Sequence, residues 1–222
     1  MLSENELRHE MCEVAHLLYS RNYIVGMDGN LSVRLPGNLL LCTPSGICKG
    51  DLTPERILKT DIAGRKISGD GSPSSELAMH LIAYKERSDV RAVVHAHPLT
   101  AVALSVAGKS LDAVLLPEVA YYLGGIVTAP YATPGTQDLA AALAPLFGRY
   151  DAVVMARHGV VTVGQSLKEA YYKVEYVEYA AQVVSLASQC GTATPLEPQE
   201  VAKLLQIRQQ RQVFHNLADQ QP

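Results

Sequence analysis

The sequence predicts an α/β fold in which helices cover a sheet with both antiparallel and parallel neighbouring strands. The first observation is a hairpin, because two short apolar runs at 31–35 and 39–42 flank the turn Pro36-Gly37-Asn38. The second is that strand-like and helical patterns alternate along the rest of the chain. A length of 222 residues suffices for one buried core, so we expect a single domain over residues 1–222.

The helices are recognised by apolar residues at helical spacing and by capping residues at their starts. Ser3 is predicted to cap the first helix, and Thr53-Pro54 is typical of the start of a short one. The loop at 68–73 leads through Ser74 into another helix. The longer predicted helices span about 3–22, 74–87, 166–189 and 198–213.

Two apolar runs that end in histidine are predicted strands. The first, from residue 92, leads into His95 and His97, and side chains two apart on a strand project from the same face. The second, from residue 152, leads into His158, beside which Gly159 is expected to let the backbone turn sharply. Three histidines at strand ends would leave a fourth metal position open, as in catalytic zinc centres.

A histidine alone is usually a hydrogen-bonded core or surface residue, and the spacing of His95 and His97 is what favours a metal. The other histidines are interpreted as ordinary core or surface residues: His9, His16, His80 and His215.

Composition excludes several classes of function. Hydrophobic residues make up 48% and charged residues 18% of a chain with a net charge of -3, so no basic field attracts nucleic acid or an anionic membrane. No apolar segment is long enough for a membrane span, and the start of the chain lacks a secretory pattern. We therefore expect a cytoplasmic protein whose scattered cysteines, Cys12, Cys42, Cys48 and Cys190, are free thiols.

Glu76 and several small polar segments lie near these histidines in the predicted arrangement. A carboxylate at a helix start beside a metal can complete the coordination or act as a general base, although the helix dipole alone also favours glutamate there. Residues 29–32, 43–46 and 74–75 combine hydroxyls, glycines and a helix start, which together can bind phosphate. Each of these segments is also an ordinary turn or cap, and their co-occurrence favours the anion site.

This set of motifs, with 95–98, 129–136 and 158–159, resembles the class II aldolase/adducin family, most closely its L-fuculose-phosphate aldolase-like branch. The resemblance covers about residues 5–190. It implies a three-layer α/β/α domain on a largely antiparallel central sheet, and a cyclic homotetramer with active sites between neighbouring subunits.

The resemblance also implies roles for individual residues. His95, His97 and His158 would hold one zinc ion per subunit, with manganese or cobalt also tolerated by three imidazoles, and Glu76 would be the catalytic acid/base. The residues expected around a substrate phosphate are Gly29, Asn30, Thr43, Ser45, Gly46, Ser74 and Ser75. No lysine is needed for a Schiff base, so the lysines are interpreted as solvated charges, although Lys49 beside the 43–46 loop is also a candidate anion contact.

The expected activity is zinc-dependent cleavage of a ketose 1-phosphate, similar to L-fuculose 1-phosphate, into dihydroxyacetone phosphate and an aldehyde through an enediolate. Where such aldolases place a tyrosine from the neighbouring subunit, this chain has Glu118 by rough alignment, and Tyr121 is a possible substitute acid. A carboxylate at this position makes the chain similar to methylthioribulose-1-phosphate dehydratase, another member of the family.

Dehydration, decarboxylation or epimerisation of a sugar phosphate on the same site is therefore the alternative activity. A non-enzymatic, adducin-like interaction domain is a second alternative. The last predicted helix is amphipathic and suited to pack on a neighbouring subunit, while Phe214 and His215 are left without a role.

Overall fold

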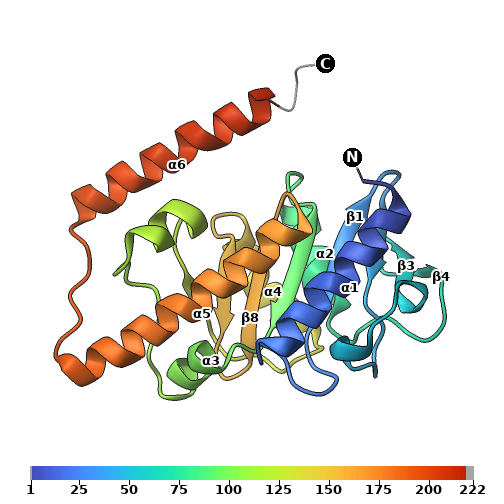
Figure 1. The fold of residues 1–222 in the computed structure, drawn as a ribbon, viewed down its shortest axis with the longest axis horizontal. Helices are drawn as coiled ribbons and strands as arrows, with labels where there is room; N and C mark the ends of the chain where they lie inside the picture. The colour runs from blue at the N-terminus through green and yellow to red at the C-terminus, as the bar shows by residue number, and fades with distance from the viewer. Residues whose placement is uncertain (1, 219–222) are drawn as a thin grey trace.

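A computed structural model describes the backbone of residues 2–218 and the side chains of residues 2–211. Its centre is an eight-stranded sheet with the strand order β4-β3-β2-β1-β5-β8-β7-β6 (Figure 1). Neighbouring strands are antiparallel throughout, except that β6 and β7 run parallel. The strands are β1 (Asn30–Leu35), β2 (Leu39–Cys42), β3 (Leu58–Asp61), β4 (Lys66–Ser68), β5 (Ala92–Ala96), β6 (Val127–Ala129), β7 (Ala152–Met155) and β8 (Gly159–Gly164).

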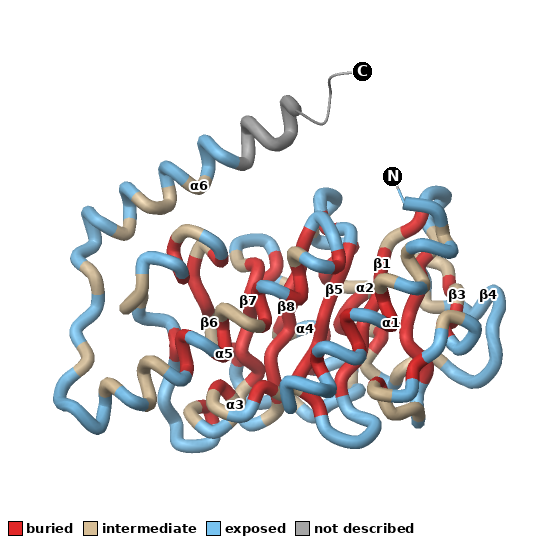
Figure 2. The backbone as a smooth tube through the Cα atoms, viewed as in Figure 1, coloured by how far each residue is buried: buried red, intermediate tan, exposed pale blue. Residues whose placement is uncertain are grey.

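Helices cover both faces of this sheet, which confirms the expected α/β class and the largely antiparallel sheet. One face packs against α1 (Glu4–Ser20), α3 (Leu99–Val106) and α5 (Leu167–Cys190), and the other packs against α2 (Leu77–Glu86) and α4 (Gln137–Phe147). The buried residues concentrate in the central strands and in the helix faces that meet them (Figure 2).

The helix starts agree with the capping residues in the sequence. Ser3 forms a capping box with Glu6, and α1 ends at Ser20, two residues before its predicted end. The short helix predicted at Thr53-Pro54 is the 3₁₀ turn η2 (Pro54–Arg56), and another such turn, η1, spans Lys49–Asp51. The hairpin between β1 and β2 turns through Gly37 and Asn38, which both have a positive φ.

The last helix, α6 (Pro198–Ala218), stands apart from the sheet as an arm (Figure 1). It lies beside the π-helical turn η3 (Val119–Leu123), and Arg211 donates a hydrogen bond of 2.5 Å to the Tyr121 hydroxyl. Arg208 on the same helix is 2.5 Å from the buried carboxylate of Asp151. Phe214 and His215 lie outside the residues whose side chains are described.

None of the described helices is both long and apolar enough to cross a membrane. The four cysteines are free thiols in the described part of the chain, as expected, and burial raises the pKa of Cys12 and of Cys42 to about 11.

Candidate active site

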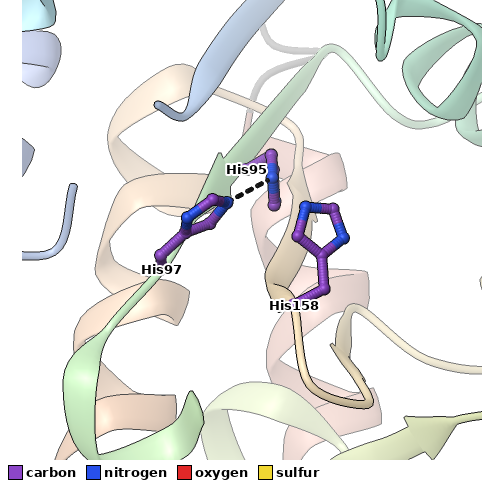
Figure 3. Close-up of side chains that lie close together, drawn as sticks. All are labelled: His95, His97 and His158. Atoms are coloured by element: carbon purple, nitrogen blue, oxygen red, sulfur yellow. Dashed lines mark hydrogen bonds between the residues drawn. The ribbon is translucent and has the colours of Figure 1, made fainter. Parts of the chain in front are cut away.

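Three imidazoles converge where the central strands end (Figure 3). His95 is in β5, His97 is one residue past the end of β5, and His158 is in the turn that joins β7 to β8. Their ring centroids are 4.7 Å, 4.8 Å and 5.1 Å apart, and one nitrogen from each ring lies within 4.8 Å of the others. The structure therefore brings together the three histidines that the sequence predicted as metal ligands.

Strand alternation determines which way His95 points. Its neighbours Val94 and Ala96 pack toward α1 and α5, so His95 projects toward α2 on the opposite face. In the paired strand β1, Asn30 lies directly across from His95. The side chains of these two residues thus meet the start of α2 together.

Gly159 has a different role from the one expected. The backbone turns sharply at Arg157, which has a φ of +62°, whereas Gly159 has an ordinary strand conformation. A Cβ on Gly159 would lie 2.6 Å from the Ala96 carbonyl oxygen, 2.6 Å from His97 Cδ2 and 2.9 Å from His95 Cε1. Gly159 is therefore required for space between the imidazoles, and the expectation of a glycine-dependent turn is wrong.

The outer nitrogens of two of the imidazoles, those of His95 and His97, have partners suited to metal ligands. His95 Nδ1 donates to the Val160 carbonyl oxygen at 2.9 Å, and His97 Nδ1 lies 3.5 Å from Asp28. With both Nδ1 atoms protonated, the two Nε2 lone pairs, 2.9 Å apart, face each other. Burial lowers the pKa of His97 to about 3, so its imidazole is neutral. A shared cation would stabilise this arrangement, and the donor set fits a divalent metal.

Two buried polar atoms support the same conclusion. Glu76 Oε1 and His158 Nδ1 are buried and lack hydrogen-bond partners among the described residues. Orphaned polar atoms inside a protein normally have an ion or a water as their partner.

Glu76 lies at the N-cap position of α2 but caps no backbone N–H there. Its carboxylate oxygens are each 3.2 Å from an imidazole nitrogen, Oε2 from His95 and Oε1 from His158. Asn30 Nδ2 donates to Oε2 at 3.0 Å. Burial alone raises the pKa of Glu76, but the adjacent imidazoles of His158 and His95 outweigh it and hold that pKa well below its usual range. An ionised carboxylate therefore stands beside the three histidines.

A cavity of about 370 Å³ opens beside this cluster. Six of the residues expected around a phosphate line it: Gly29, Asn30, Ser45, Gly46, Ser74 and Ser75. Thr43 is not among the lining residues, because its buried hydroxyl accepts a hydrogen bond from the Leu31 amide at 3.1 Å. The polar loops and the start of α2 thus meet in one cavity, next to Glu76.

Lys49 also lines the cavity, and its interpretation as a solvated charge is wrong. The residue is only 1% exposed, and Nζ donates to the carbonyl oxygens of Met27 at 2.9 Å and Ile47 at 2.8 Å. Among the described residues, no carboxylate lies within ion-pair distance of it. Burial lowers the pKa of Lys49, so its ammonium would gain from an anion in the cavity.

Glu118 and Tyr121 are not among the residues lining this cavity. Glu118 is exposed before η3, and Tyr121 lines a separate cleft of about 880 Å³ between α5 and α6. Within one chain, neither side chain is brought to the histidines.

His80, interpreted from the sequence as an ordinary core or surface histidine, is fully buried on α2. Its Nε2 lies 2.6 Å from Asn30 Oδ1, which connects it to the residue that holds Glu76. The sequence feature that could have identified His80 is its position four residues after Glu76, which places both side chains on one helix face.

Comparison with known proteins agrees with this geometry. Residues 9–185 match the family described as the Class II Aldolase and Adducin N-terminal domain. The chain is 38% identical to a 3-oxo-tetronate 4-phosphate decarboxylase of Escherichia coli O6:H1, over 82% of this chain and 87% of the relative. It is 40% identical to an L-fuculose phosphate aldolase of Methanococcus vannielii, over 78% of this chain and 93% of the relative.

The fold is similar to a solved structure of an L-fuculose 1-phosphate aldolase, with a TM-score of 0.86 and 34% identity. That likeness covers 93% of this chain and 97% of the solved one.

Proposed function

Because this chain belongs to the class II aldolase and adducin family, we propose that it is a metal-dependent lyase that breaks a carbon–carbon bond in a phosphorylated hydroxy-ketone. The observation that carries the proposal is the meeting of three imidazoles with the ionised Glu76 beside a polar cavity. These same side chains argue against a purely structural, adducin-like role.

His95, His97 and His158 would hold the metal, with zinc as the first choice for three imidazoles and manganese or cobalt as alternatives. Such a metal supplies Lewis-acid stabilisation of the negative charge that develops on the substrate oxygens as the bond breaks. Glu76 would carry the proton, since its carboxylate is ionised, held by Asn30 and open to the cavity.

The substrate phosphate would lie in the 370 Å³ cavity. Ser45, Ser74 and Ser75 offer hydroxyls there, Gly46 offers backbone, and the positive end of the α2 dipole points toward it. Lys49 would supply the positive charge, because it is buried without a carboxylate partner.

Two reactions fit this site, and they share one product. Cleavage of a ketose 1-phosphate such as L-fuculose 1-phosphate releases an aldehyde and leaves the enediolate of dihydroxyacetone phosphate. Loss of carbon dioxide from 3-oxo-tetronate 4-phosphate leaves the same enediolate, and one proton on carbon completes either product. We place aldol cleavage first and decarboxylation second; the second is favoured by the 38% identity to a relative named for it.

The test is product analysis by mass spectrometry on purified, zinc-loaded protein, with and without a chelator. The panel contains L-fuculose 1-phosphate, 3-oxo-tetronate 4-phosphate and methylthioribulose 1-phosphate. Chelator-sensitive formation of dihydroxyacetone phosphate supports the lyase, and the second product, aldehyde or carbon dioxide, identifies the reaction. Loss of water from methylthioribulose 1-phosphate without carbon–carbon cleavage would replace this proposal with a dehydratase.

We also propose that residues 1–222 act as one domain in a cytoplasmic homotetramer whose active sites lie between subunits. Glu118 or Tyr121 of a neighbouring subunit would then reach the cavity that they do not line in their own chain. Light scattering gives the mass of the assembly. Mixing a Glu76→Gln chain with a chain changed at Glu118 and Tyr121 tests sharing, because mixed tetramers regain activity only at shared sites.

A further inference from the structure

We propose that His80 is a positioning residue, which holds the Asn30 amide in one orientation and thereby aims the Glu76 carboxylate at the metal site. The inference deepens the proposed function and rests on it for the role of Glu76. It stands on a buried chain of hydrogen bonds between α2 and β1 that runs from Tyr84 to Glu76.

Matching periodicities bring these side chains together. Along α2, Glu76, His80 and Tyr84 recur every four residues and share one face of the helix. Along β1, Asn30 and Ser32 are two residues apart and share one face of the strand. Four residues of helix advance about 6 Å and two residues of strand about 6.6 Å, so the two polar rows stay in step.

The contacts follow from this alignment. Tyr84 OH lies 2.8 Å from Ser32 Oγ, and Ser32 Oγ lies 2.7 Å from His80 Nδ1. His80 Nε2 lies 2.6 Å from Asn30 Oδ1, and Asn30 Nδ2 donates to Glu76 at 3.0 Å. Ser32, His80 and Tyr84 are each 3% exposed or less. Water therefore does not compete for the bonds among these three side chains.

The carboxylate end determines the direction of every bond. Asn30 Nδ2 donates to Glu76 Oε2, so the Asn30 carbonyl oxygen is the atom turned toward His80. His80 must then carry its proton on Nε2. Its other nitrogen accepts from Ser32, which in turn accepts from the Tyr84 hydroxyl.

Burial keeps both distant members in the required neutral state. It is the main cause that lowers the pKa of His80 to about 3, and it raises the pKa of Tyr84 well above its usual value. Arg34, whose guanidinium carbon lies 4.9 Å from the centre of the Tyr84 ring, donates to the Tyr84 carbonyl oxygen. The far end of the chain is thus fixed as well.

The consequence for the site is a fixed Asn30 amide. Without a donor at His80, the buried Oδ1 of Asn30 would have no partner and the amide would lose its preferred orientation. Glu76 would then lose the N–H that holds Oε2, while His95 would keep its bond to the Val160 carbonyl oxygen and His97 its contact with Asp28.

The first test is the tautomer of His80, measured on the intact protein labelled with ¹⁵N-histidine. A long-range ¹H–¹⁵N correlation spectrum at neutral pH distinguishes the two neutral forms, and the signal of His80 is the one that the His80→Gln variant lacks. We expect a neutral ring protonated on Nε2. A ring protonated on Nδ1, or an imidazolium, would overturn the inference whatever the activity of the protein.

The second test compares two substitutions at His80. Leucine removes the donor, and we expect kcat to fall about tenfold, the effect of one lost hydrogen bond, with KM changed by less than about threefold. Glutamine can place an N–H near the imidazole Nε2 position, so kcat should recover to within about threefold of the parent. Bound zinc should stay at the parental stoichiometry in both variants.

A packing control separates positioning from general destabilisation. Leu143→Ala creates a cavity in the buried core of α4 without replacing any member of the polar chain, and should lower the melting temperature without lowering kcat. If His80→Gln is as impaired as His80→Leu, or if Leu143→Ala loses kcat equally, His80 is only structural. If the tautomer is as expected but no substrate in the panel is cleaved, the proposed function fails and the polar chain stands.

Discussion

Lys49→Met removes a buried positive charge from the cavity while keeping most of the side-chain volume. Lys49 is 1% exposed and is held by two backbone carbonyl oxygens, those of Met27 and Ile47. If its ammonium contacts the substrate phosphate, the loss equals one hydrogen bond between charged groups. Such a bond contributes about 1.5–3 kcal/mol, or about 10- to 150-fold in affinity.

Two opposing effects act on the stability of the free protein. The substitution leaves two carbonyl oxygens without a donor, at about 1–3 kcal/mol each. It also removes a buried charge without an ion pair, whose effective desolvation cost is several kcal/mol. These terms oppose each other, so we expect the free energy of unfolding to change by less than about 2 kcal/mol.

Isothermal titration with inorganic phosphate and the KM for the cleaved substrate measure the effect, and urea unfolding measures the stability. Lys85→Met is the matched control, because Lys85 is exposed near the end of α2 and does not line the cavity. A Lys49→Met protein that binds phosphate and substrate as tightly as the parent would refute the assignment.

Four further outcomes are expected. Glu76→Gln should keep its metal, measured by mass spectrometry, but lose about 10²- to 10⁴-fold in kcat, the usual contribution of an acid/base residue. Turnover at the parental rate would exclude Glu76 as the acid/base residue. Gly159→Ala should lose metal and melt earlier, because its Cβ would collide with two imidazoles, whereas Gly148→Ala, with 3.9 Å to its nearest neighbour, should not. Although burial raises the pKa of Asp151, three cations outweigh burial and lower that pKa. The stabilisation that Asp151 contributes is therefore fully present above the unfolded-state pKa of about 3.9, and it is lost as the pH falls through the lower pKa of the folded state. Asp151→Asn should therefore cost about 3–5 kcal/mol at neutral pH in urea unfolding, and the difference from the parent should shrink in acid. Tyr121→Phe should lower the rate of aldol cleavage more than the rate of decarboxylation; an equal loss of both would show that Tyr121 does not act at the leaving carbon.

Local signals in the sequence were sufficient for the helix caps, for the first hairpin and for the pair of candidate metal ligands His95 and His97. The capping box at Ser3 and the turn at Gly37 and Asn38 involve residues close in sequence, so their patterns are visible without a structure. The pair His95 and His97 is similarly local, since strand alternation alone places both on one face. The layer arrangement of the sheet was predictable only through the family resemblance.

Contacts between distant segments could not be predicted in the same way. Lys49 resembles a surface lysine in its sequence context, and only the packing of the loops around Met27 and Ile47 buries it. His80 and Ser32 are 48 residues apart, so their contact depends on the register of α2 against β1. The space that Gly159 leaves for the imidazoles likewise depends on the pairing of β8 with β5.

Under the proposed function, the residues around the cavity would serve the half of the substrate that both candidate reactions share. In the proposed function, the phosphate contacts, the candidate metal ligands and Glu76 would all act on the three carbons that become dihydroxyacetone phosphate, so none of them would separate aldol cleavage from decarboxylation. The reactions differ at the leaving carbon, because forming an aldehyde requires removal of a hydroxyl proton and releasing carbon dioxide does not. A residue that decides between them must therefore reach the leaving carbon. Glu118 and Tyr121, which lie away from the cavity of their own chain, can do so only from a neighbouring subunit.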